Sequence, residues 1–190
     1  LDAMVYVAKH EGNLAKNKVV VMAGILDSSR FKSFIAKELK VSVRDVNALV
    51  LGSHGDEMIP LPAHTSVNGI PLKELLPQNV INRLTNRTKN AGAEVIRLEQ
   101  SSAFYSPGAS VVEIVESIIK AKGRVLPCSA YRTGEYGIKN VCMGVPVRLG
   151  SNGIEEVIEV KLTPEEKKQF MINVKKVQNL IQILKKDGLA

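Results

Sequence analysis

The hydrophobic pattern changes from helical to strand-like near Arg124, and this change restricts the fold more than any other feature of the sequence. After it, three apolar runs follow one another: Arg124–Arg132, Val141–Leu149 and Glu155–Val160. The segments between them, Thr133–Gly137 and Asn152-Gly153, are typical of turns. Strands joined by short turns pair antiparallel, so the sequence predicts a three-stranded meander. Helices clustered with such a sheet indicate an α+β fold, an antiparallel sheet packed with long helices, and not a repeating βαβ fold.

Long helices are predicted on both sides of this change. Gln78–Glu99 carries an apolar stripe at helical spacing, and Pro107-Gly108 opens a second striped segment. Thr163-Pro164-Glu165-Glu166 is a capping box with Pro in the first helical position, which predicts the start of a last helix. The residues expected to face inward are Ile81, Leu84, Ala91, Val95 and Leu98, then Val111, Ile114, Val115, Ile118 and Ile119, then Phe170, Val174, Val177, Ile181 and Leu184.

The first third of the chain alternates between predicted helices and strands. The expected order is a helix over Leu1–Lys9, a strand over Lys18–Met22, a helix capped by Asp27-Ser28-Ser29, and strands over Val46–Leu51 and Leu61–Val67. The inward residues of the capped helix are Phe31, Phe34, Ile35 and Leu39. Asn68-Gly69 predicts a tight turn after the last of these strands.

Length and composition predict one globular domain over residues 1–190. The chain has 190 residues, enough for one substantial core but too few for two full domains. Its 45% hydrophobic and 24% charged residues argue against disorder. No apolar stretch approaches the length of a membrane helix, and the N-terminus lacks the features of a signal peptide. We therefore expect a cytoplasmic protein that does not contact a membrane.

The net charge of +7 raises the question of nucleic-acid binding. Much of the excess lies in three lysine pairs of the last predicted helix, where a solvated helix face is the simpler explanation. The chain has only four Phe, four Tyr and no Trp, and these do not alternate with basic residues in the manner of a base-stacking surface. An RNA-binding domain is therefore the least favoured function, and we expect no nucleic-acid partner.

The two cysteines are predicted to be reduced. A hairpin that turns near Tyr136 places Cys128 opposite residues near Val145 and not opposite Cys142. Two buried thiols in a cytoplasmic protein are the expected state.

Three polar residues point to a site for chemistry. Asp27 and Arg30 are three residues apart at a helix start, so both can face one pocket, while His54 lies between Gly52 and Gly55 in a loop that follows an apolar strand. Histidine exchanges protons near neutral pH, an adjacent carboxylate stabilises its charged form, and an arginine fork binds a carboxylate. Together they describe a site for a small acid with a group that gains or loses a proton.

Simpler roles are open for each of these residues. An Asp at a helix start is commonly a cap, an Asp–Arg pair is commonly a weak surface ion pair, and a His between glycines is commonly part of a turn. The sequence contains no G-x-G-x-x-G or G-x-x-x-x-G-K-[ST] motif, so it offers no glycine-rich phosphate loop. His10, His54, His64 and the two cysteines lack the spacing of a zinc site, so no metal is expected.

Three segments resemble the malate branch of the lactate/malate dehydrogenase family. They are M-A-G-I-L-D-S-S-R-F over 22–31, L-G-S-H-G-D-E-M-I-P over 51–60, and S-A-F-Y-S-P-G-A-S over 102–110. The first resembles the active-site helix of that branch, the second its catalytic histidine loop, and the third its pocket-lining segment. The likeness extends in order along the whole chain, and it implies the C-terminal, substrate-binding domain of that family.

The resemblance implies a role for each matching residue. His54 would be the acid/base for the C2 hydroxyl of malate, Asp27 would orient His54, and Arg30 would clamp a substrate carboxylate. Met22 and His54 would lie near the nicotinamide of NAD. Ala103 and Ser106 would line the substrate pocket, and Asp56 would shape the loop without reacting. The implied partners are a small dicarboxylate, malate or oxaloacetate, and further copies of the chain in a homo-oligomer.

The sequence also departs from the complete family pattern. The Rossmann NAD-binding domain, with its glycine fingerprint and closing loop, precedes the segment that matches Leu1 in this family, and none of it is present in this sequence. We therefore expect NAD to be held mainly by that absent domain, and this chain alone to turn over little malate. The arginine that separates malate from lactate also belongs to the absent part, so lactate-type specificity stays an alternative, as does a non-enzymatic oligomerisation module.

Overall fold

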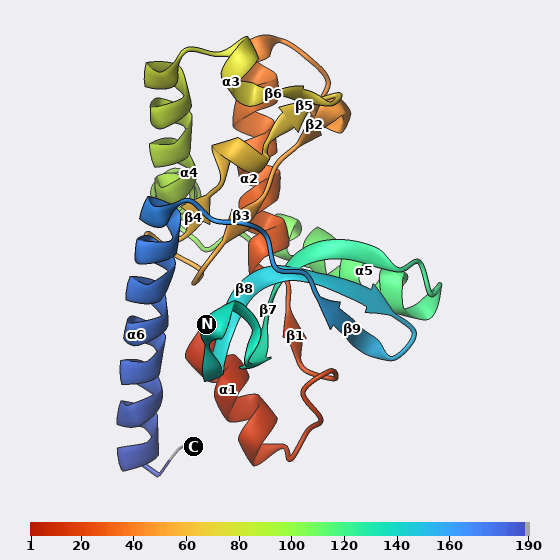
Figure 1. Ribbon diagram of the computed structural model, residues 1–190, viewed down its shortest axis with the longest axis vertical. Helices are drawn as coiled ribbons and strands as arrows, with labels where there is room; N and C mark the ends of the chain where they lie inside the picture. The colour runs from red at the N-terminus through yellow and green to blue at the C-terminus, as the bar shows by residue number, and fades with distance from the viewer. Residues whose placement is uncertain (189–190) are drawn as a thin grey trace.

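The computed structural model describes residues 1–188 and shows a four-stranded antiparallel sheet surrounded by helices (Figure 1). The order of the strands across this sheet is β1 (Val20–Val21), β7 (Arg124–Thr133), β8 (Lys139–Gly150) and β9 (Gly153–Val157). Four helices pack against β7 or β8: α1 (Asp2–Glu11), α2 (Ala23–Leu39), α5 (Tyr105–Ile119) and α6 (Pro164–Lys186). The predicted α+β fold is confirmed.

The smaller elements lie at the other end of α2 (Figure 1). They form a three-stranded sheet of β2 (Val46–Asn47), β5 (Ser66–Val67) and β6 (Ile70–Pro71), and a two-stranded pair of β3 (Val50–Leu51) and β4 (Ile59–Pro60). The short helices η1 (Val43–Asp45), η2 (Pro62–His64) and α3 (Leu72–Leu75) lie in the connections here, and α4 (Gln78–Glu99) packs along α2. The short helix η3 (Glu135–Gly137) instead connects β7 and β8 of the large sheet.

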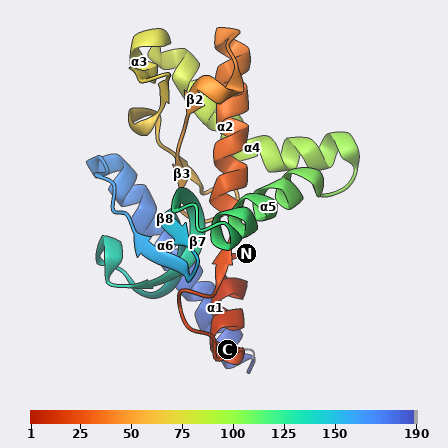
Figure 2. The same ribbon diagram turned by 90° about the vertical axis from the view of Figure 1, so that its right-hand side faces the viewer.

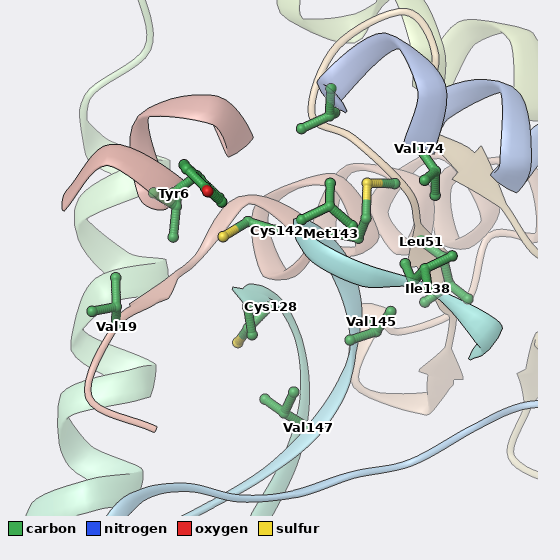
Figure 3. Close-up of a cluster of buried hydrophobic side chains, with 14 of the residues drawn as sticks. Tyr6, Val19, Leu51, Cys128, Ile138, Cys142, Met143, Val145, Val147 and Val174 are labelled. Carbon is green, nitrogen blue, oxygen red and sulfur yellow. The ribbon is translucent and has the colours of Figure 1, made fainter. Parts of the chain in front are cut away.

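Two clusters of buried side chains form the core. The first surrounds the large sheet and includes Val145 and Val147 of β8, Tyr6 of α1 and Val174 of α6 (Figure 3). The second lies around the later part of α2 and includes Phe31 and Ile35. Helix α2 contributes to both clusters, because Ile25 near its start belongs to the first.

Several predictions from the sequence are confirmed. Helix α4 has the predicted bounds, and Thr163 forms the capping box of α6 with Glu166. Asn68 and Gly69, with φ of 48° and 86°, form the turn between β5 and β6. The three-stranded meander is present, and Cys128 pairs with Val145 while Cys142 pairs with Tyr131. Both cysteines are buried and free.

Other predictions are wrong in detail. The strand over Val46–Leu51 is two separate two-residue strands in different sheets, and Leu61–Val67 is mainly a 3-10 turn that begins at Pro62. The strand over Lys18–Met22 is only Val20–Val21, and the last strand runs over Gly153–Val157. The apolar character of these runs reflects burial. A strand also needs a neighbouring strand to pair with its backbone, and the apolar pattern alone does not show where that neighbour lies.

The apolar stripes of α4 and α5 are only partly buried. Ile81, Leu84 and Ala91 are buried, but Leu98 is 70% exposed; in α5 Ile114 is buried, but Ile119 is 77% exposed. Figure 2 shows the end of α4 and α5 projecting together to one side of α2. Residues 1–188 therefore supply no covering partner for this part of the two stripes.

Candidate active site

Helix α2 begins five residues earlier than the sequence suggests, so the prediction that Asp27 caps it is wrong. Met22 is the N-cap residue, and the first helical residue is Ala23. The first turn packs closely on the large sheet: a Cβ at Gly24 would lie 2.7 Å from the carbonyl oxygen of Pro127 on β7, so only glycine allows the approach. Asp27 is consequently inside the helix, where its side chain can face Arg30 across one turn.

Contacts with two neighbouring elements hold the His54 loop in place. Gly52 forms an isolated antiparallel bridge with Gly144 of β8, with N–H to carbonyl distances of 2.9 and 3.1 Å. Gly52 and Gly55 have φ of 88° and 126°, a region that L side chains rarely adopt. The Ser28 hydroxyl of α2 accepts a hydrogen bond from the backbone N–H of Val50 at 3.0 Å, which ties the preceding strand to the helix that carries Asp27.

Helix α2 and the His54 loop bring His54, Asp27 and Arg30 together. The Nδ1 of His54 lies 2.8 Å from Oδ2 of Asp27, and an Nη of Arg30 lies 3.4 Å from Oδ1 of the same carboxylate. The Asp27 side chain is 2% exposed, whereas the His54 side chain is 30% exposed. A buried carboxylate thus contacts an imidazole that solvent can reach.

The hydrogen bond that the His54 ring donates to the Asp27 carboxylate raises the pKa of His54 above its ordinary value of 6.5, since it favours the charged ring; burial opposes this effect, and the charge of Asp27 adds to it. With Nδ1 directed at the carboxylate, Nε2 is the nitrogen left to exchange a proton, and no hydrogen bond to it comes from the residues that the structure describes. The arrangement can therefore accept and donate a proton near neutral pH.

Arg30 lines a pocket of about 370 Å³ between α2 and α4. Ser29 and Ser106 share this pocket, and its remaining walls are mainly apolar. Ala103 does not line it; together with Ser106, it lines a neighbouring pocket of about 320 Å³. Met22 is partly buried and packs against the first core cluster at the N-terminus of α2. Ser106 is thus the one residue of the third motif that shares a pocket with Arg30.

Two polar residues of this region are absent from the sequence prediction. Asp2 accepts a hydrogen bond from the His54 backbone N–H at 3.1 Å, and Asn173 accepts from the Ser53 N–H at 3.1 Å and from the Ser53 hydroxyl at 2.8 Å. Asn173 could have been found, because it is a polar residue beside the inward stripe of α6. Asp2 carries no such signal, since an acidic residue in the first turn of a helix is ordinary.

Two further observations on the described chain concern metal binding and membrane-spanning helices. No three His, Cys, Asp or Glu side chains within residues 1–188 gather closely enough to hold a metal ion. In the same residues, no helix combines the length and the apolar character needed to cross a membrane.

Known proteins provide an independent comparison. The sequence profile described as "lactate/malate dehydrogenase, alpha/beta C-terminal domain" matches residues 25–187. The malate dehydrogenase of Heliobacterium modesticaldum is 47% identical to the chain over 184 residues, which is 96% of this chain and 60% of the relative. The malate dehydrogenase of Chlorobium phaeobacteroides is 53% identical over 167 residues, which is 87% of this chain and 54% of the relative. The chain therefore spans little more than half the length of these curated relatives.

Solved structures agree in fold. The malate dehydrogenase of Salinibacter ruber superposes with a TM-score of 0.94 at 48% identity, covering 99% of this chain and 63% of that one. The lactate dehydrogenase of Cryptosporidium parvum, complexed with lactic acid and β-nicotinamide adenine dinucleotide, superposes with a TM-score of 0.92 at 39% identity, covering 97% and 60%. The likeness thus extends to both dehydrogenase types, with higher identity to the malate type in this pair.

Proposed function

This chain belongs to the lactate/malate dehydrogenase family, and we propose that it is the catalytic, substrate-binding domain of an NAD-dependent malate dehydrogenase. The observation that carries the proposal is the contact of His54 with the buried Asp27 carboxylate, beside Arg30. The malate dehydrogenase relatives cover most of this chain and support the malate type. Lactate-type specificity stays the alternative, since lactate dehydrogenases share the fold.

His54 would act as the acid/base. When malate is oxidised, neutral Nε2 takes the proton of the C2 hydroxyl, and the Asp27 carboxylate stabilises the imidazolium that forms. In the reverse direction, the charged ring returns that proton to the carbonyl oxygen of oxaloacetate. Because Asp27 is already buried and aligned, it needs no rearrangement when the charge appears on the ring.

Arg30 would bind a carboxylate of the substrate. Asp27 contacts its guanidinium, and Arg30 lines the pocket between α2 and α4, which neither Asp27 nor His54 lines. A planar fork with several N–H groups can make two parallel hydrogen bonds to a carboxylate. Ser106 shares this pocket and would line the substrate site; Ala103, in the neighbouring pocket, is the less well supported of the two.

The residues present fit only one end of NAD. When bound, NAD supplies a nicotinamide ring that takes a hydride from the C2 carbon or returns it. The partly exposed His54 and the apolar side chain of Met22 are suited to lie beside that ring. The sequence has no glycine-rich loop for the pyrophosphate, so we propose that the part of the relatives outside this match holds most of NAD.

The exposed apolar surface and the buried thiols support two further parts of the proposal. Phe104, Tyr105, Val112 and Ile119 are 64% to 83% exposed on or beside α5, a surface suited to a further protein partner such as a second copy of the chain. Cys128 and Cys142 are buried free thiols, as is usual in the reducing cytoplasm. A homo-oligomer in the cytoplasm is therefore the proposed state.

The experiment is to join residues 1–190 to the N-terminal part of the Heliobacterium modesticaldum malate dehydrogenase and to measure reduction of oxaloacetate and of pyruvate. We expect the joined protein to prefer oxaloacetate, and His54→Asn to lower kcat/KM about 100- to 10,000-fold, because general acid–base catalysis contributes that much. The control is His64→Asn, an exposed histidine outside the site. Equal activity of the two variants would contradict the proposal, and a preference for pyruvate would favour the lactate type.

A further inference from the structure

The carboxylate of Asp2 holds the backbone of the His54 loop. Asp2 is the first residue of α1 and is 4% exposed. Its Oδ2 accepts the backbone N–H of His54 at 3.1 Å, and its Oδ1 accepts the hydroxyl of Ser129 at 2.5 Å. Both carboxylate oxygens are therefore used by partners that are far away in the sequence.

This contact joins three elements at one point. Ser129 lies on β7, where it pairs with Val21, and Val21 is followed directly by Met22, the N-cap residue of α2. Asp2 thus connects the start of α1, the large sheet beside α2, and the loop that carries His54. The ring of His54 is fixed by Asp27 of α2, while its backbone is fixed by Asp2 of α1.

Asn173 of α6 holds the neighbouring residue of the same loop. It accepts both the N–H and the hydroxyl of Ser53, and its own amide group donates to the carbonyl of Gln169 at 2.8 Å. Asn173 is completely buried. Consecutive residues of the loop are therefore held from two helices that pack against each other.

We propose that Asp2 is a positioning residue for His54, fixing the backbone of the catalytic loop so that the imidazole meets Asp27. The simpler explanation is that Asp2 only stabilises the N-terminus of α1. That explanation requires no contact with His54, whereas the Asp2 carboxylate accepts the backbone N–H of His54 at 3.1 Å. The consequence for catalysis rests on the proposed function, whereas the positioning itself does not.

Several charges surround His54. Asp27 and Arg30 face it from α2, and Asp2 faces it from α1. The loop itself carries Asp56, which is exposed, and Glu57, which is paired with Lys176 of α6. Asp2 is among the groups whose charge raises the pKa of His54, and Asp56 is not. Asp56→Asn is therefore a matched control, since it removes one carboxylate charge, as Asp2→Asn does, but from the loop that carries His54 and not from α1.

The first test follows the His54 amide of the 190-residue chain by NMR hydrogen exchange. Asp2→Ala removes the acceptor, and we expect the His54 amide to exchange about tenfold faster or more, because hydrogen bonds to charged groups are the stronger ones. Asp2→Asn keeps an acceptor oxygen and should restore most of the protection, while Asp56→Asn should leave it unchanged. An unchanged exchange rate in Asp2→Ala would overturn the proposal.

The second test uses the titration of the His54 ring, assigned with His54→Asn. Asp2→Asn should lower the pKa of His54, while Asp56→Asn should lower it less. Equal shifts in both variants would mean that Asp2 acts only as a distant charge. If Asp2→Ala does not fold, the exchange and titration measurements are made on Asp2→Asn and on Ser129→Ala. The latter removes the second partner of the Asp2 carboxylate.

Activity of the joined protein separates this proposal from the function. Asp2→Ala should lower kcat more than it raises KM, and Asp2→Asn should recover part of kcat, because the substrate contacts of Arg30 are kept. If exchange and titration change as expected while the joined protein has no dehydrogenase activity, positioning stands and the proposed function fails. If the protein is active and Asp2→Ala changes neither exchange nor kcat, the function stands and positioning fails.

Discussion

The Asp27–His54 pair combines an almost completely buried carboxylate with a ring that is 30% exposed. A buried carboxylate needs partners, and here they are the ring of His54 and the guanidinium of Arg30. An arginine guanidinium cannot be deprotonated in proteins, whereas an imidazole ring can lose its proton. The interaction of the carboxylate with His54 therefore depends on pH, and its sign follows from the raised pKa of the ring.

The first prediction concerns this pH dependence. Because the folded-state pKa of His54 lies above the unfolded value near 6.5, the stabilisation from the charged pair is fully present below that value. It is lost as the pH rises through the folded-state pKa. We expect the free energy of unfolding by urea to fall over this pH range in the unmodified chain, and to fall less in Asp27→Asn, which keeps the shape of the side chain without its charge.

The control for this measurement is Asp45→Asn, which removes an exposed carboxylate from η1. It should follow the pH dependence of the unmodified chain. Parallel curves for all three proteins would show that the pair contributes nothing over this range. In the joined protein, loss of the His54 proton should affect the rates of the two reaction directions oppositely. As the pH rises, the rate of oxaloacetate reduction should fall and the rate of malate oxidation should rise.

At the scale of elements, the junction between the His54 loop and β8 is the tightest backbone approach in the site. Gly52 and Gly144 exchange two backbone hydrogen bonds, and a Cβ at Gly144 would overlap the carbonyl oxygen of Gly52. The obstacle is backbone and not a flexible side chain, so it cannot be relieved by a rotamer change. Glycine at 144 is therefore required by a contact between two elements that are distant in the sequence.

Gly144→Ala gives the prediction at this scale. We expect it to destabilise the chain by roughly 1–3 kcal/mol, as overpacking does, and to change the NMR shifts of residues 52–55. The measurement is urea unfolding together with amide spectra. Gly108→Ala is the control, because nothing lies within 4 Å of a Cβ at that helical position. A Gly144→Ala protein as stable as the Gly108→Ala protein would contradict the tight packing of the junction.

Elements with a long, regular pattern could be predicted from the sequence, and short ones could not. Helix α4 and the capping box of α6 are local features, so the sequence contained all that was needed. The strands β2 and β3 have two residues each, too few to display a period, and their partners lie elsewhere in the chain. Elements defined by distant neighbours were therefore predicted as apolar runs but not as separate strands.

The residues of the candidate site also divide into those with a local sequence signal and those defined only by distant contacts. The convergence of Asp27, Arg30 and His54 could be predicted as a hypothesis because each stands in a recognisable motif. The carboxylate of Asp2 could not, because it contacts a residue 52 positions away from an ordinary helical position. The early start of α2 was also missed, since its N-cap residue Met22 makes no side-chain cap hydrogen bond and so carries no local start signal.

At the scale of the whole molecule, α2 connects the two core clusters. Ile25 lies in the cluster around the large sheet, and Phe31 and Ile35 lie in the cluster with α4 and the small strands. One continuous helix therefore contributes to both, and the candidate site residues Asp27 and Arg30 lie between these contributions. We expect the two clusters to unfold together, as one domain over the described chain.

Thiol labelling tests this cooperativity, because Cys128 and Cys142 lie only in the first cluster and are 0% exposed. Burial raises the pKa of each thiol to about 12, so each reacts essentially only after the sheet opens. Ile35→Ala in the second cluster should destabilise the chain by about 2–5 kcal/mol and speed labelling roughly 30-fold or more. Lys37→Ala, an exposed change on the same helix, should have little effect. If Ile35→Ala melts helical structure while labelling stays slow, the clusters unfold separately, and α2 does not transmit stability from one to the other.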